Sequence, residues 1–244
     1  MYVLAKTLLL NIRQKLQLPV ECLFVSTFGK KQGFQARILS DSDTGDIVFL
    51  IHASKKTTSK EFKKHLMKFV TNMVQRANSE SQFAAVTYGS TPETIFEFSK
   101  FQNKKAIRKT FKKVKAKKRS KTADIVAALK HVRTKVFVPE SGDLDSNPNH
   151  IVIITDQTSK KLNESALQDE LYQLRMNRTR VFHISIDKSQ PYIEKEREIQ
   201  LIGHLVGQNA TYVVRNYSAL LSSKELPRKL GRAMRPFCEF NILK

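Results

Sequence analysis

Buried strands alternate with amphipathic helices along most of the chain. The clearest strand covers Asp46–His52, where five consecutive apolar residues precede a polar loop, a pattern typical of a strand buried on both faces. A helix is expected over 58–77, because apolar residues recur there at helical spacing. Ligands of parallel α/β sheets bind at the carboxyl ends of strands. His52 and Ser54 therefore mark the edge where a site is expected.

The rest of the chain continues this alternation. A turn at 89–92 separates a strand over 82–88 from a short strand over 94–99, so these two are expected to form an antiparallel hairpin. The pattern then predicts helices over 103–114 and 123–136, a strand over 150–155, a helix over 163–176, a strand over 181–186, a helix over 192–206, a strand over 211–214 and a helix over 218–234. The expected fold class is α/β, a doubly wound, mostly parallel sheet with one antiparallel edge strand and helices on both faces.

The two ends of the chain have similar patterns. Each has a short amphipathic helix that is followed by a proline and then a cysteine, Cys22 at one end and Cys238 at the other. This similarity either arises by chance or marks residues 1–22 as the tail of a preceding copy of the same domain. The expected organisation is an N-terminal helix over 1–22, a linker over 23–45, an α/β domain over 46–238 and a C-terminal tail over 239–244.

Composition limits the function classes. The 244 residues suit one large domain, and the net charge of +21 favours polyanionic partners without choosing among them. Cys22 and Cys238 form either one disulfide, conditional on secretion, or two thiols. No stretch is apolar enough to span a membrane. The N-terminus is interrupted by Lys6 and lacks a cleavage signal, so it is expected to be a helix and not a signal peptide.

The strongest local charge lies between Lys104 and Lys121, where no acidic residue occurs. Such a run is usually a solvated helix face, but here no acidic neighbour relieves the repulsion. A polyanion would relieve it, and the scarcity of aromatics favours sulfated glycosaminoglycan or acidic protein over nucleic acid. The candidate polyanion-binding residues are Lys104, Lys105, Arg108, Lys109, Lys112, Lys113, Lys117, Lys118 and Arg119.

Three loops carry matching polar chemistry, namely 52–56, 120–123 and 154–156. With these loops the chain resembles the von Willebrand factor type A domain family, from about Asp46 to Cys238. Segments that fit the family pattern follow in the same order, including the strand over 46–51 and the strand end at Asp156. The resemblance is strongest to the type A repeats of extracellular-matrix proteins such as type VI collagen chains. It implies a metal-ion-dependent adhesion site in which hard oxygen ligands hold Mg²⁺.

That site is expected to be degenerate here. In the family pattern Ser54, Ser120 and Asp156 keep an oxygen ligand, and Thr122 is a substitute for Ser120. His52 replaces the first aspartate and Lys56 replaces a serine. An ammonium about 5 Å from a dication would cost on the order of several kcal/mol at an effective dielectric constant near 20, and imidazole suits Zn²⁺ better than Mg²⁺. The Mg²⁺ ion of the family is therefore expected to be lost and no cofactor is expected.

The expected function is not catalytic. The sequence has neither a nucleophile elbow nor a phosphate-binding glycine loop. The resemblance implies an adhesion or matrix-interaction domain, extracellular, with collagen or another matrix component as its protein partner. Because the N-terminus is not expected to be a signal peptide, a cytoplasmic protein-interaction scaffold is the alternative, and polyanion binding through 104–121 is a third. Sequons conditional on secretion occur at Asn163, Asn177, Asn209 and Asn216.

Overall fold

In the computed structural model the chain divides into two compact units. The smaller unit includes a two-stranded antiparallel sheet of β1 (Cys22–Ser26) and β2 (Ala36–Ser40), which lies within the range predicted as a linker except for Cys22, the last residue of the predicted N-terminal helix. The helix expected before Cys22 lies outside the described residues, and so does the tail over 239–244. The described residues are 22–26, 36–40, 45–52, 60–77, 80–100, 103–113, 123–156, 162–186, 193–207, 210–223 and 225–234.

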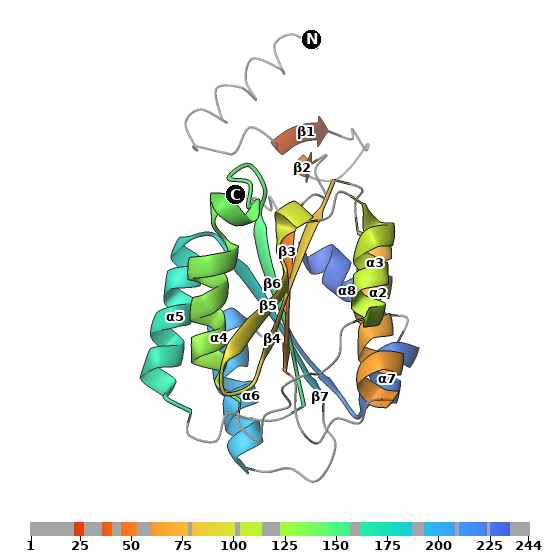
Figure 1. Cartoon of the computed structure of the whole chain (residues 1–244). Coiled ribbons are helices and arrows are strands. Elements are labelled where there is room, and N and C mark those ends of the chain that lie inside the picture. The colour runs from red at the N-terminus through yellow and green to blue at the C-terminus, as the bar shows by residue number, and fades with distance from the viewer. Residues whose placement is uncertain are drawn as a thin grey trace, which may run out of the picture. The chain divides into compact units, whose positions relative to one another are not determined.

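The larger unit is built on a six-stranded sheet with the order β5-β4-β3-β6-β7-β8 (Figure 1). All neighbouring pairs are parallel except β4 with β5, which is antiparallel at one edge. The predicted fold class is therefore confirmed. The strands are β3 (Asp46–His52), β4 (Gln82–Tyr88), β5 (Pro92–Phe96), β6 (Asn149–Thr155), β7 (Arg180–Ile186) and β8 (Thr211–Val214).

Helices cover both faces of this sheet, in two groups that Figure 1 shows on its right and its left. Successive side chains along a strand point to opposite faces of the sheet. Every second residue of a strand therefore packs against one group of helices, and the remaining residues pack against the other group. The first group is η1 (Glu61–Leu66), α2 (Met67–Arg76), α3 (Lys104–Lys113), α7 (Tyr217–Ser222) and α8 (Glu225–Met234). The second is α4 (Ile125–His131), η3 (Val132–Val136), α5 (Glu164–Met176) and α6 (Ile193–Val206).

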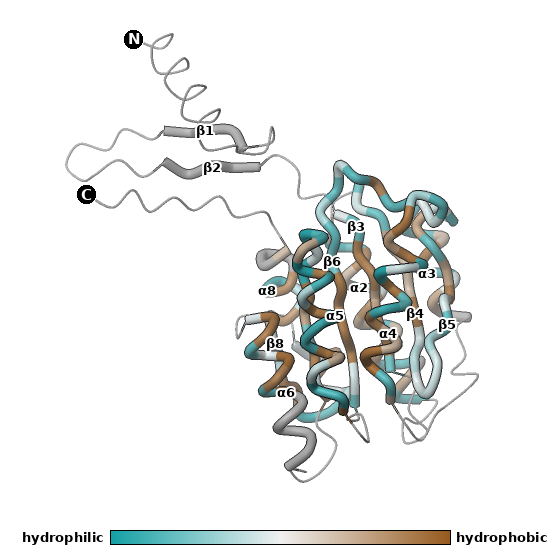
Figure 2. Tube along the Cα trace, turned by 90° about the vertical axis from the view of Figure 1, so that its left-hand side faces the viewer, coloured by the Kyte–Doolittle hydropathy of each residue, from teal (hydrophilic) through white to brown (hydrophobic). Residues whose placement is uncertain are grey.

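The hydropathy of the elements matches these layers. The strand β6 is mostly hydrophobic along its length, whereas α4 and α5 carry both hydrophobic and hydrophilic positions (Figure 2). Phe49 on β3 is fully buried, and its ring contacts Phe83 of β4 and Phe111 of α3 at centroid distances of 6.2 and 6.1 Å. These aromatic contacts attach α3 to the centre of the sheet.

Two predicted elements differ from the structure. The short edge strand begins at Pro92 and ends at Phe96, two residues earlier than predicted at its start, and a 3₁₀ turn η2 (Phe98–Lys100) follows it. The single helix predicted over 218–234 is two helices, α7 and α8. Pro227 has no backbone N–H to donate to the carbonyl of Ser223, and its ring would crowd that carbonyl in a continuous helix. The chain is extended at Ser223 instead, and the hydroxyl of Ser223 accepts a hydrogen bond from the N–H of Leu226 at 3.1 Å.

Candidate functional site

Two of the predicted site residues meet at one edge of the sheet. His52 is the last residue of β3, and Asp156 directly follows β6. These strands are parallel neighbours, with Ile51 paired with Ile154. Their carboxyl ends therefore lie together, at the edge where parallel α/β sheets bind ligands.

The two side chains contact each other directly. The Nδ1 atom of His52 lies 3.2 Å from the Oδ1 atom of Asp156, and the two side chains are only 0% and 1% exposed. A carboxylate can only accept, so Nδ1–H donates in the tautomer that this contact requires. The ring of His52 also lies 5.2 Å from the ring of Tyr88 on β4. Within the described part of the chain, the Nε2 atom of His52 has no hydrogen-bond partner.

The other positions of the predicted adhesion site, Ser54, Lys56, Ser120 and Thr122, lie outside the described residues. Over the segments that are described, no three His, Cys, Asp or Glu side chains form a group able to hold a metal ion. A search of those same segments finds no helix that is both long and apolar enough to cross a membrane. The disulfide stays a prediction, because Cys22 lies in β1 but Cys238 is not described.

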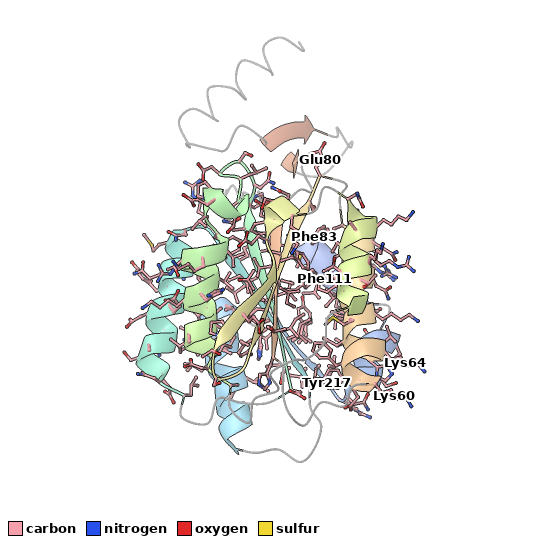
Figure 3. All side chains as sticks on the ribbon, in the orientation of Figure 1. Lys60, Lys64, Glu80, Phe83, Phe111 and Tyr217 are labelled. Carbon is pink, nitrogen blue, oxygen red and sulfur yellow. The ribbon has the colours of Figure 1, made fainter. Side chains whose placement is uncertain are left out.

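The basic run begins on α3, whose two faces differ sharply. Ile107 and Phe111 are buried against the sheet, and Figure 3 shows Phe111 pointing to the interior. Lys105, Arg108 and Lys109 are exposed. Lys112 and Lys113 end the helix, and Lys117, Lys118 and Arg119 lie outside the described residues.

Lys104 has an internal role in addition to its charge. Its Nζ atom donates a hydrogen bond to the carbonyl of Ala77, the residue that caps α2. Burial lowers the pKa of Lys104. This ammonium group therefore links α3 to the C-terminal end of α2. A cation at that position also stabilises α2, because it compensates the partial negative charge at the C-terminus of a helix.

Two of the four sequon asparagines have a clear structural role. Asn163 and Asn216 are the N-caps of α5 and α7, and each side-chain oxygen accepts a backbone N–H, that of Ala166 at 3.1 Å and that of Ala219 at 2.7 Å. Asn177 is exposed at the C-terminal end of α5, and Asn209 is not described. Helix capping alone accounts for an asparagine at both N-cap positions.

A second polar cluster, which sequence reasoning did not predict, lies around the start of β3. The fully buried carboxylate of Asp46 accepts hydrogen bonds from the N–H of Leu144 at 2.9 Å and from Asn147 Nδ2 at 2.8 Å. Burial, together with the nearby Asp46, raises the pKa of Asp143 to about 6. The alternating polar residues from 143 to 149 are the only signal of this cluster in the sequence.

Comparisons with known proteins agree with the fold. The family model of the von Willebrand factor type A domain matches residues 46–225 of this chain. No curated protein sequence matches the chain. A structure of proximal thread matrix protein 1 from the mussel byssus is similar with 21% identity, a TM-score of 0.67 and coverage of 78% of this chain and 47% of that one.

Two further similar structures contain a bound metal. One is the same mussel protein with a zinc-occupied MIDAS motif, at 20% identity and a TM-score of 0.66, with coverage of 75% of this chain and 47% of that one. The other is the manganese-loaded TRAP protein of Plasmodium vivax, at 10% identity and a TM-score of 0.60, with coverage of 79% and 74%. This chain spans about half the length of the mussel structures, and these low identities establish the fold alone.

Proposed function

Because this chain belongs to the von Willebrand factor type A domain family, we propose that it is a non-catalytic protein-interaction domain of the adhesion type, in which the adhesion site works without Mg²⁺. The observation that carries this proposal is the buried contact between His52 and Asp156. The expected partner is a component of the extracellular matrix, collagen being one candidate.

The donor set of this edge does not fit Mg²⁺. The ion prefers about six oxygen ligands at about 2.0–2.1 Å, but the described residues supply one carboxylate and one imidazole. The imidazole already binds an oxygen of Asp156 through a hydrogen bond, so a cation that bound this oxygen would have to break that hydrogen bond. The sequence adds Lys56, four residues after His52, whose charge repels a dication.

The matrix role is supported by fold similarity to a byssal matrix protein. The alternative is an intracellular scaffold of the same fold, and that role would not need the Mg²⁺ site either. The two differ in location, so they predict opposite outcomes for the redox state of Cys22 and Cys238. A bridged pair in secreted protein supports the matrix role.

Two measurements test the proposal. A site with a dissociation constant near 1 mM would stabilise the fold by about 1.4 kcal/mol in 10 mM Mg²⁺, which corresponds to roughly 3–6 °C in melting temperature for a chain of this size. We expect no such shift. The full chain should also bind at least one immobilised matrix protein, fibrillar or type VI collagen first, equally well with Mg²⁺ and with EDTA. Binding that EDTA abolishes, or no binding across the matrix panel, would overturn the proposal.

A further inference from the structure

Two neighbouring helices carry rows of exposed basic residues on the same side of the sheet. On α3, Lys105, Arg108 and Lys109 have the spacing of one helix face and are exposed. The opposite face of α3 buries Ile107 and Phe111. The apolar face therefore fixes the direction in which this row of charges points.

The segment of η1 and α2 repeats this arrangement. Lys64, Lys68 and Arg76 are exposed, whereas Leu66 and Val70 are buried against the sheet. Figure 3 shows Lys64 extending outward from this helix, on the side away from the sheet. Neither α2 nor α3 contains an acidic residue, so no ion pair within either of these two helices compensates their charges, and η1 contains one acidic residue, Glu61.

The structure holds the two rows close together. The helices α2 and α3 contact each other, and the Lys104 ammonium bonds the carbonyl of Ala77 at the end of α2. Packed helices lie about 8–10 Å apart, which is close to the screening length of about 8 Å at physiological ionic strength. The two rows therefore lie on adjacent helical segments on the same side of the sheet, and we call the six residues together the basic face: Lys64, Lys68, Arg76, Lys105, Arg108 and Lys109.

The other side of the sheet has a different balance. The helix α5 carries three acidic residues, Glu164, Asp169 and Glu170, and one basic residue, Arg175. Glu170 is paired there with Arg133 at 2.6 Å. Charges on that side are therefore partly compensated, and the excess positive charge of the described helices lies on the side of the sheet that carries the basic face.

We propose that the basic face binds sulfated glycosaminoglycan, with both helices contributing. A linear polymer with regularly spaced sulfates can contact two adjacent rows of cations at once. Single-stranded nucleic acid fits less well, since the large exposed apolar side chains of the described residues are Leu144, Tyr172, Met176 and Val213, none of them on α2 or α3, and base stacking needs exposed aromatics.

The test compares three triple variants of the full chain with the same loss of charge. One removes the α3 row (K105Q, R108Q, K109Q) and one removes the row on η1 and α2 (K64Q, K68Q, R76Q). The matched control removes Lys130, Lys135 and Arg175, which are exposed on the opposite side of the sheet, by the same change to glutamine. All nine positions are exposed, so circular dichroism and melting should be unchanged, which the experiment verifies first.

Heparin is the probe, and its affinity is measured over a range of salt concentrations. Each basic-face triple should reduce the slope of log K against log salt by about 3, because each contact with a polyanion contributes about 1. The control triple should leave the slope nearly unchanged, and heparin stripped of sulfate, which keeps only its carboxylates, should bind all of the chains much more weakly.

Three outcomes would overturn the proposal. An equal decrease of the salt slope in all three variants would mean that net charge alone determines the affinity for heparin. A loss confined to the α3 triple would mean that one helix binds alone. Tighter binding to duplex DNA of matched charge than to heparin would assign the face to nucleic acid. None of these outcomes depends on the edge around His52 and Asp156, so the proposal above stands or fails separately.

Discussion

The imidazole of His52 and the carboxylate of Asp156 meet at 3.2 Å although 104 positions separate them in the sequence. Both groups are buried, and a buried polar group that loses its hydrogen-bond partner costs its full desolvation penalty. This contact therefore stabilises the strand ends that it joins. It also occupies the carboxylate that the family pattern assigns to a metal.

Removing this carboxylate should destabilise the fold. We expect Asp156→Ala to lower the free energy of unfolding by about 1–3 kcal/mol, because the Nδ1–H of His52 then has no acceptor at this position. Asp156→Asn keeps an oxygen in place and should cost clearly less. Urea denaturation at pH 7 measures both. Equal losses in the two variants would show that the His52 contact contributes little.

Asp143 should make stability depend on pH. Burial and Asp46 raise its pKa to about 6 in the folded protein, above the value near 3.8 in the unfolded chain. Between these values the folded state holds the proton more tightly, so Asp143 lowers stability as pH rises from about 4 to about 6. Asp143→Asn should therefore stabilise the protein at pH 7, on the order of 1–2 kcal/mol after allowing for partial exposure.

The measurement for Asp143 is a comparison of two chains over pH 4–7. Burial lowers the pKa of His150 to about 3, so His150 makes the fold less stable as pH falls below about 6.5. The difference between the wild-type chain and the Asp143→Asn variant cancels this effect. A difference that does not grow between pH 4 and pH 6 would contradict the prediction.

The ion pair between Arg133 and Glu170 should contribute measurably to stability. Two hydrogen bonds join them, Nε to Oε1 at 2.6 Å and Nη2 to Oε2 at 3.1 Å, and the Glu170 side chain is only 8% exposed. Arg133→Met leaves that carboxylate buried and unpaired, so it should cost more than Glu170→Gln. A double-mutant cycle should give a coupling of about 1–3 kcal/mol. A coupling below about 0.5 kcal/mol would class the pair with ordinary surface ion pairs.

The sequon at Asn163 offers a test that separates helix capping from glycosylation. Asn163→Asp keeps the oxygen that accepts the N–H of Ala166 and places a negative charge at the helix start, so stability should be retained. Asn163→Ala removes the cap and should cost about 1 kcal/mol. Thermal unfolding of protein made in bacteria, which carries no glycan, measures this difference. Equal stability of the two variants would contradict the capping role.

Much of the fold was accessible from the sequence, because long apolar runs are unambiguous. Continuous hydrophobic residues predict β3 and β6, and the turn before Pro92 predicts the antiparallel edge. The break before α8 was missed because the apolar spacing continues through it, while Pro227 acts locally on the carbonyl of Ser223. The strands β1 and β2 were missed because Ser, Asp, Thr and Gly residues cluster before β3, and this cluster led to the prediction of a linker over 23–45.

The site was only partly accessible. The sequence predicts that His52 and Asp156 share an edge, because parallel strands end together. Their hydrogen bond was not predictable, since it depends on strand register and on the rotamers of both side chains. The Asp46 cluster was missed for the same reason, because Leu144 and Asn147 come from a loop about a hundred residues away. The position of α2 beside α3 also required the structure, and the run of lysines on α3 alone did not reveal the second row.

Two substitutions, His52→Asp and Lys56→Ser, would give this chain the residues that the family pattern has at these positions. His52→Asp puts a second carboxylate beside Asp156, at an edge where both side chains are buried. Two negative charges about 4 Å apart repel by about 4 kcal/mol at an effective dielectric constant of 20, so the variant should be less stable than the natural chain in EDTA. Lys56→Ser in the same variant removes a positive charge four residues along the chain and gives position 56 the residue of the family pattern.

Magnesium should then restore the stability of this double variant. If the loops hold the remaining oxygen ligands, a dissociation constant near 0.1 mM would give about 2.7 kcal/mol of stabilisation in 10 mM Mg²⁺, several degrees in melting temperature. His52→Asn with Lys56→Ser is the matched control, because it has the same shape without the added charge and should not respond. A double variant that folds but melts at the same temperature in Mg²⁺ and in EDTA would mean that more than His52 and Lys56 separates this edge from a metal site.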